Sequence, residues 1–248
     1  MTKLYDIQSS LLLNVDGSCE YNTPNIKVLA AVTGPIEPKA RQEIPQQLAL
    51  EIVVKPCVGI GPTPREVLIQ DKIHAVLQHV LCKYLYPRKL LQLTFQIIQN
   101  SYFTPSDNNI THTINSNKNI GIDPSTFCEL STCLNSAFIA LLDSGIGLQT
   151  SYASCCIGIV TDSAAKDKLI DLTTQFPEST LKSCHVIVLE INDAKQISNV
   201  LMIDSAGSFT EKDLLNVLTY AENRAIEKMA IFRSVISSKL QRDFIWRE

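Results

Sequence analysis

The sequence predicts an α+β protein in which helices stack on mixed β-sheets around a β-α-β centre. Runs with a period of two residues alternate with runs of helical spacing, in the order strands, helix, strand, helix, four strands, helix. The 248 residues are 45% hydrophobic and 19% charged, which is sufficient for a sizeable buried core. Because no linker-like stretch separates these runs, we expect one domain over residues 1–248.

The first half of the chain predicts two strands, a helix and a third strand. Residues 26–33 alternate between two faces, and residues 48–56 are rich in β-branched side chains and stop at a proline. Residues 91–97 give the clearest alternation in the chain. Between them a helix is expected from near Arg65 to the "YPRK" stretch. Its apolar side chains recur at helical spacing, namely Ile69, Ile73, Val76, Val80 and Tyr84.

The second half begins with a polar, asparagine-rich stretch at about 101–122, which we interpret as an exposed loop insertion. A second helix opens at Asp123-Pro124 and ends at Gly145. Strands are expected at 151–160, 168–172, 184–191 and 197–204, before a last helix that starts at Thr210 with Asp213 in a capping box. The expected buried stripes of the two helices are Phe127, Leu130, Leu134, Ala137 and Leu141, and then Leu214, Leu218, Ala221, Ala225, Met229, Phe232 and Ile236.

Composition and motifs exclude several classes of function. At a net charge of −3 the chain has no overall basic excess that would indicate nucleic-acid binding by itself, and local basic patches stay open. The start of the chain has no secretory signal pattern, the apolar runs are too short to cross a bilayer, and the eight cysteines lack metal-ligand spacing. Glycine-rich phosphate loops and a GxSxG elbow are absent, and His74 and His79 are not four residues apart. We therefore expect a reducing intracellular compartment, no membrane and no cofactor, and no motif alone indicates an enzyme.

Several stretches, taken in order, resemble the RNase PH family. They are "DGS", "KVLAAVTGPIEPKARQE", "LALEIVVKP", the helix from Arg65, "YPRKLLQLTFQIIQ", "NSAFIALLDSGI" and "VLMIDSAGSFTEKDLLNVL". Within the family they look most like the RNase PH-type subunits of the eukaryotic RNA exosome ring. The resemblance runs from about Asp16 to the last helix, and it implies an RNase PH-like fold.

The resemblance also locates an active site that this sequence does not preserve. Active relatives cleave RNA from the 3′ end with phosphate, and they hold the anion in a clamp of basic and hydroxyl side chains at a helix start. The matching positions here read Phe127, Cys128, Glu129, Leu130 and Ser131. A carboxylate at Glu129 would repel the attacking anion. The resemblance thus implies that the clamp is lost.

The paired aspartates of active relatives are also incomplete. Asp171 matches the first one, but it also suits a plain polar strand end. The second would fall near "FPES", where only Glu178 is acidic, and Asp162 and Asp167 are out of pattern. Metal binding and general-acid catalysis at the scissile phosphate need both carboxyl groups. We expect a member that keeps the fold and has lost the chemistry.

Membership of the exosome ring would imply a structural role. The expected partners are other RNase PH-like subunits in a hetero-hexameric ring, cap subunits with RNA-binding domains, an associated hydrolytic nuclease, and RNA. The process would be 3′-to-5′ processing and decay of rRNA, snRNA and mRNA, in the nucleus and nucleolus and also the cytoplasm. Two alternatives stay open: a phosphate-dependent 3′ exoribonuclease with a degenerate site, and a homo-oligomer that binds nucleic acid or hydrolyses it.

Three cations are candidates for the RNA path, and each also has a plain structural interpretation. Arg65 falls where active relatives use a substrate-facing arginine, but it equally suits a solvated helix start. Arg88 follows a helix end, where a cation suits the helix dipole. Lys72 lies on a helix surface, as solvated lysines commonly do.

The "GPIEPKARQE" stretch is interpreted as architecture. Two prolines stiffen it, and mixed charges on a rigid corner suit the choice of a ring neighbour. The interface candidates are Glu37, Lys39, Arg41 and Glu43.

Overall fold

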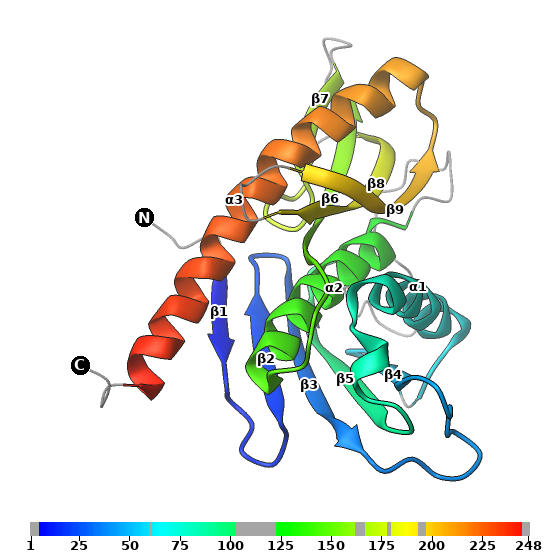
Figure 1. Ribbon diagram of the computed structural model, residues 1–248. Helices are drawn as coiled ribbons and strands as arrows, with labels where there is room; N and C mark the ends of the chain where they lie inside the picture. The colour runs from blue at the N-terminus through cyan, green and yellow to red at the C-terminus, as the bar shows by residue number, and fades with distance from the viewer. Residues whose placement is uncertain are drawn as a thin grey trace.

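Two β-sheets share one helix between them, and a second, much longer helix runs along both (Figure 1). The computed structural model describes residues 5–59, 61–102, 123–161, 167–177, 180–192 and 197–244. The predicted α+β class and the predicted order of elements are confirmed. The expected loop at about 101–122 lies outside the described residues, apart from its first two.

The first sheet holds the N-terminal half of the chain in the strand order β1-β2-β3-β5-β4. The strands are β1 (Asp6–Ser9), β2 (Gly17–Asn22), β3 (Ile26–Ile36), β4 (Ala49–Lys55) and β5 (Leu90–Asn100). All neighbours are antiparallel except β4 and β5, which are parallel and joined by α1 (Pro64–Val80). Parallel neighbours need such a crossover, so the predicted β-α-β centre is confirmed.

The second sheet is antiparallel throughout, in the order β7-β6-β8-β9. Its strands are β6 (Ser151–Thr161), β7 (Asp167–Asp171), β8 (Thr180–Ile191) and β9 (Ile197–Gly207). The four predicted strand runs of the second half correspond to these strands. Strands β6 and β8 are buried on both faces, because α2 covers one face and α3 covers the other.

Helix α2 (Pro124–Ser144) packs on β2 and β3 of the first sheet and on β6 and β8 of the second. Its predicted start and end are confirmed: the Asp123 carboxylate accepts from the Ser125 amide at 3.1 Å, and Gly145 adopts a left-handed φ of 73°. The apolar stripe is wider than predicted, because a helix between two sheets is buried on almost every side. Its length and mean hydropathy would suit a membrane span, but 83% of its most apolar window is buried in this fold.

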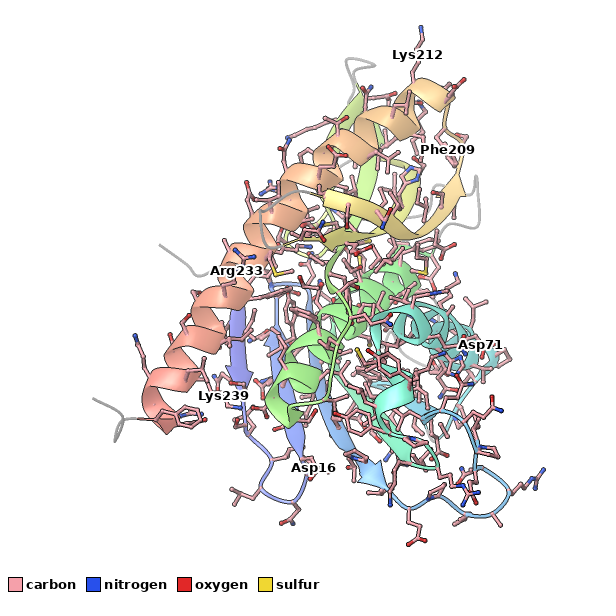
Figure 2. The ribbon with its side chains drawn as sticks, in the orientation of Figure 1. Asp16, Asp71, Phe209, Lys212, Arg233 and Lys239 are labelled. Carbon is pink, nitrogen blue, oxygen red and sulfur yellow. The ribbon has the colours of Figure 1, made fainter. Side chains whose placement is uncertain are left out.

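Helix α3 (Glu211–Asp243) has 33 residues, about 50 Å of helix, and it packs on β6, β8 and β1. The predicted capping box between Thr210 and Asp213 is present. The predicted inward stripe is only partly correct, because Leu214, Leu218 and Ile236 are half-buried. Figure 2 shows Lys239 near the end of α3, where it pairs with Asp143 at the end of α2.

An ion pair with both side chains 2% exposed fixes α3 to the second sheet. The Lys228 ammonium lies 3.3 Å from the Asp171 carboxylate and donates to the Ser154 carbonyl at 3.2 Å. The Tyr5 hydroxyl, just before β1, donates to the same carboxylate at 3.4 Å. Burial alone would lower the pKa of Lys228, and the Asp171 charge raises it above its ordinary value. The lysine therefore stays charged within the core.

Three sequence predictions need correction. Strand β3 continues past residue 33 to Ile36, because Ile36 pairs with Leu90 on β5 after an irregularity in the ladder. At this irregularity the Gly34 amide donates to Asp16 at 2.7 Å, and the Gly34 backbone adopts a φ of 140°. A Cβ there would lie 2.7 Å from the Leu90 carbonyl oxygen, so the close approach of β5 needs glycine. Tyr84 is not on α1, which ends at Val80; it lies in a 3₁₀ turn (Lys83–Leu85) and is 66% exposed. Strands β1 and β2 were not predicted.

Replacing one partner of the buried pair should be costly. We expect Asp171→Ala to lower the free energy of unfolding by about 3–5 kcal/mol, because it leaves the Lys228 charge buried without a partner. Urea unfolding of the purified chain measures this. Asp243→Ala, which removes the exposed partner of Arg242, is the control and should change stability by less than about 1 kcal/mol. Equal effects of the two variants would contradict the assignment.

Candidate functional site

The starts of α1 and α2 and the end of β5 meet in a cluster of polar side chains around Arg65 and Glu129. We call it the Arg65–Glu129 cluster; its members are Arg65, Asn100, Asp123, Ser125, Thr126 and Glu129. Helix α1 begins at Pro64 because Thr63 and Glu66 form a capping box. This start directs the next side chain, Arg65, towards the beginning of α2.

The Arg65 guanidinium makes three short contacts to α2. Its Nη2 lies 2.7 Å from Glu129 Oε2 and 2.5 Å from the Ser125 hydroxyl, and its Nε lies 2.7 Å from the Thr126 hydroxyl. The Asp123 carboxylate is 3.6 Å from the same Nε. Arg65 is therefore not a solvated helix-start residue. Its assignment to an RNA path stays a prediction.

Glu129 is buried, and its carboxylate is held from two sides. Its Oε2 accepts a hydrogen bond from the Arg65 guanidinium, and its Oε1 accepts one from the Asn100 side-chain amide at 2.5 Å. Burial raises the pKa of Glu129 to about 7, although the Arg65 charge and the Asn100 hydrogen bond act to lower it. The Glu129 carboxyl group is thus the internal acceptor that this arginine contacts.

The start of α2 lies earlier than the positions that match the phosphate clamp. Because α2 begins at Pro124, the amides from Phe127 onward have carbonyl partners one turn back within the helix. Cys128, Leu130 and Ser131 are buried, and the Ser131 hydroxyl is 3.0 Å from that of Ser154. None of these groups is free to bind an external anion.

The acidic pair of active relatives is not assembled among the described residues. Asp171 is committed to Lys228 and also accepts from the Thr173 amide at 3.0 Å. Asp171 is the last residue of β7, which agrees with its interpretation as a polar strand end, and it is in addition the buried partner of Lys228 on α3. Glu178 and Asp162 lie outside the described residues. Asp167 pairs instead with Lys182 at 2.8 Å.

The other two RNA-path candidates also have partners. Lys72 pairs with Asp204 on β9, and its ammonium lies 5.6 Å from the centre of the Phe127 ring. The interpretation of Lys72 as a solvated lysine is thus incorrect. Arg88 is 70% exposed and lies 3.4 Å from the Glu43 carboxylate. RNA contacts by Lys72 and Arg88 stay predictions.

The interface candidates lie on an exposed corner after β3. Glu37, Lys39, Arg41 and Glu43 are all exposed, and of these only Glu43 has an ion-pair partner among the described residues. The Gln42 amide donates to the Lys39 carbonyl at 2.8 Å, which closes a turn in the corner. Three unpaired charges on a fixed turn agree with the docking interpretation, which no contact with a second chain tests.

The described part of the chain offers no cluster of three His, Cys, Asp or Glu side chains that could hold a metal ion. Seven of the eight cysteines are buried, and Cys57 is partly buried. Sequence reasoning missed Asn100, Ser125, Thr126 and Lys228. The Ser125-Thr126 pair directly after Asp123-Pro124 was a visible signal of a hydroxyl-bearing helix start, whereas no local pattern distinguishes Lys228 from a surface lysine.

The two sheets around a shared helix, with an arginine and helix start facing each other, define the class of RNase PH-like α+β proteins. The chain belongs to the RNase PH family, described as a 3′ exoribonuclease family, and residues 3–147 match domain 1 of that family.

Relatives cover nearly the whole chain. Exosome complex component RRP46 of Saccharomyces cerevisiae (strain ATCC 204508 / S288c) is 39% identical over 93% of this chain and 94% of its own length. Exosome complex component rrp46 of Schizosaccharomyces pombe (strain 972 / ATCC 24843) is 28% identical over 88% of this chain and 82% of its own length. The crystal structure of rice (Oryza sativa) Rrp46 matches with a TM-score of 0.70 and 18% identity over 92% of each chain, which shows the shared fold.

Stability should depend on pH through Glu129. In the folded state Glu129 keeps its proton up to about pH 7, whereas in the unfolded chain it releases the proton near pH 4.5. The contribution of protonated Glu129 to the free energy of unfolding is therefore complete below pH 4.5 and is lost as the pH rises to about 7. Glu129→Gln cannot ionise. We expect its stability relative to the native chain to improve between pH 5 and pH 8 by on the order of 2–3 kcal/mol, measured by urea unfolding. The exposed Glu227→Gln serves as the control, and a pH-independent difference for Glu129→Gln would contradict the assignment.

Proposed function

We propose that this chain is a non-catalytic structural subunit of the RNA exosome core, where it helps to form the ring and channel for 3′-to-5′ RNA processing and decay. Membership of the RNase PH family supports the architecture. The similarity to two proteins named as exosome complex components, over most of this chain, supports the assembly. Among the RNase PH-type ring subunits, the sequence looks most like the one called exosome component five, and this agrees with the RRP46 name of these relatives.

The observation that carries the non-catalytic assignment is the pairing of Glu129 with Arg65. A phosphorolytic site must leave a guanidinium and helix-start amides open to phosphate. Here the Arg65 guanidinium instead donates to the buried carboxyl group of Glu129 at 2.7 Å. The backbone amides at the positions that match the clamp lie within α2 and not at its start. Asp171 is committed to Lys228. These internal contacts of Glu129 and Asp171 support the proposal that the chemistry is lost.

The partners follow from this assignment. They are other RNase PH-like subunits in a hetero-hexameric ring, cap subunits with RNA-binding domains, and a hydrolytic nuclease that receives the RNA. The substrates of the whole assembly would be rRNA, snRNA and mRNA, in the nucleus and nucleolus and also in the cytoplasm. Within this chain, the exposed corner after β3 would face a ring neighbour, and Arg65, Lys72 and Arg88 are the candidates for RNA contact.

Native mass spectrometry of the tagged chain, isolated from its own cells at endogenous level, tests the proposal. We expect a large assembly with one copy of this chain and several other RNase PH-like chains. Purified alone, the chain should release no nucleoside diphosphates from RNA in the presence of magnesium and phosphate. Phosphate-dependent release would favour a degenerate exoribonuclease, and recovery only as a homo-oligomer would favour a free-standing nucleic-acid-binding protein or nuclease.

Reversal of charge on the exposed corner should weaken assembly without weakening the fold. Lys39→Glu combined with Arg41→Glu changes two exposed side chains that have no ion-pair partner among the described residues. We expect the free energy of unfolding to change by less than about 0.5 kcal/mol, and we expect the amount of partner subunits recovered with the chain to fall several-fold. Lys212→Glu, on the far end of α3, is the matched control. Unchanged recovery of partners by the double variant would remove the corner from the interface.

A further inference from the structure

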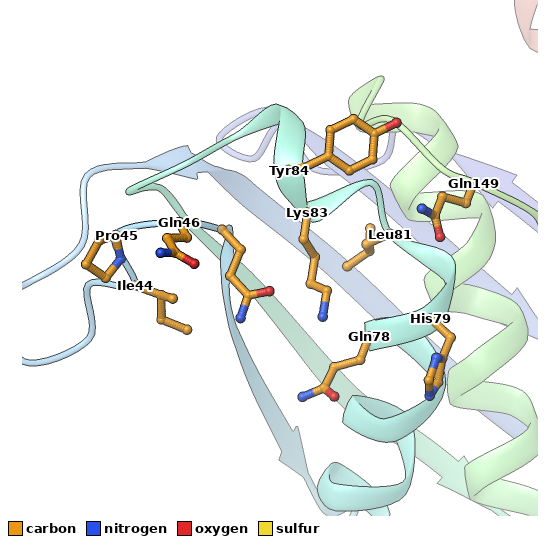
Figure 3. Close-up of a pocket in the computed structure, with 10 residues that line it drawn as sticks. Ile44, Pro45, Gln46, Gln78, His79, Leu81, Lys83, Tyr84 and Gln149 are labelled. Atoms are coloured by element: carbon orange, nitrogen blue, oxygen red, sulfur yellow. The ribbon is translucent and has the colours of Figure 1, made fainter.

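A second polar site lies at the opposite end of α1 from the Arg65–Glu129 cluster. It is a pocket of about 620 Å³ between the segment before β4, the end of α1 and the turn that follows α1 (Figure 3). From Arg65 to Gln78 the helix extends about 20 Å, so the two sites are separate. The polar and aromatic side chains that line the pocket include Gln46, Gln47, Gln78, Lys83, Tyr84 and Gln149.

Main-chain hydrogen bonds hold the walls of this pocket together. The Leu48 amide donates to the Lys83 carbonyl at 3.0 Å, the Cys82 amide to the Gly147 carbonyl at 3.0 Å, and the Gln149 amide to the Val80 carbonyl at 2.8 Å. Three segments that are distant in sequence are thus fixed by their backbones. Their side chains are not needed for that purpose.

The polar side chains of the pocket are largely unpartnered. Lys83 is half-buried, its ammonium points into the pocket in Figure 3, and it makes no ion pair or side-chain hydrogen bond with any residue that the structure describes. The side-chain amides of Gln46, Gln47 and Gln149 have no hydrogen-bond partner in the described part of the chain either. A half-buried cation surrounded by open amides is a site for an anionic ligand with hydrogen-bonding edges.

An aromatic ring on the rim of the same pocket narrows the class of ligand. Tyr84 is 66% exposed at the rim of the pocket and offers a face on which a planar group can stack. A smaller pocket of about 270 Å³ shares Gln47, Gln78 and Lys83 and continues along β4. Its one carboxylate, Glu51, accepts from Gln42 at 3.4 Å and forms no ion pair with Lys83 in the described part of the chain.

We propose that this pocket binds a nucleotide, with its phosphate on Lys83, its base stacked on Tyr84 and the base edge read by the glutamine amides. An acidic peptide would use the lysine but not the aromatic face and the amides together. The nucleotide can be free or part of a single RNA strand, since both present the same groups. This inference stands on the pocket alone and does not depend on the proposed function.

The test measures binding by the full chain with fluorescence anisotropy, using a short labelled single-stranded RNA, and with 5′-AMP as a competitor. We expect saturable binding, a Kd at least about tenfold higher for Lys83→Met, and a several-fold increase for Tyr84→Ala. Lys212→Met is the matched control, because this exposed lysine lies at the far end of α3 in Figure 2, and it should bind as the native chain does.

The possible outcomes separate the sources of the ligand. Displacement of the RNA by 5′-AMP supports a mononucleotide site, whereas saturable RNA binding that 5′-AMP does not displace supports a strand site. Absence of saturable binding, equal binding by native chain and Lys83→Met, or equal displacement by an oligoglutamate peptide would overturn the proposal. Photo-crosslinking of thiouridine-containing RNA provides a readout without any variant: crosslinks should fall on residues 78–84, and crosslinks confined to other segments would also overturn it.

Discussion

The buried ion pair between Lys228 and Asp171 is the interaction on which the rest of the structure depends. It joins the middle of α3 to the end of β7, and the Tyr5 hydroxyl brings the chain just before β1 to the same carboxylate. A buried charge is strongly destabilising without its partner. A shift of α3 along the sheets would separate Lys228 from Asp171 and leave a buried charge unpaired, so the ion pair opposes such a shift. The register of the long helix across both sheets is therefore set by electrostatics, as well as by the apolar contacts of Ala221, Ala225 and Phe232.

The same physical device appears again at the start of α2. There the Glu129 carboxyl group is the internal acceptor, Arg65 is the cation and Asn100 is the neutral donor. In both places a charged group that suits external chemistry is neutralised by a side chain of the same chain. An ion pair of this kind fixes two elements in place, and it removes the open charge that a phosphate or a metal ion would need. The structural use of these residues agrees with the proposed loss of catalysis.

Charges without an ion-pair partner among the described residues lie at two places on the surface instead. The corner after β3 carries exposed charges of both signs, and the pocket at the end of α1 contains Lys83, which forms no ion pair in the part of the chain that the structure describes. Both rest on backbones that are fixed by main-chain hydrogen bonds, so their side chains contribute little to the fold. Such groups are available for other molecules, and this distribution suits a protein that acts through its surfaces.

The sequence by itself determined the α+β class, the order of the predicted elements and the caps of α2 and α3, because period, proline position and capping residues are local properties. The same locality explains why the short strands β1 and β2 were missed: their pairing supplies the stability that their own pattern does not show. Only the tertiary structure decided that Arg65 meets Glu129, that Lys228 is buried on Asp171, and that Tyr84 leaves α1 for the rim of a pocket. The first two pairs are 64 and 57 residues apart in sequence, and the position of Tyr84 depends on where α1 ends. Burial, which shifts the pKa values of the paired groups, is a property of the packed chain.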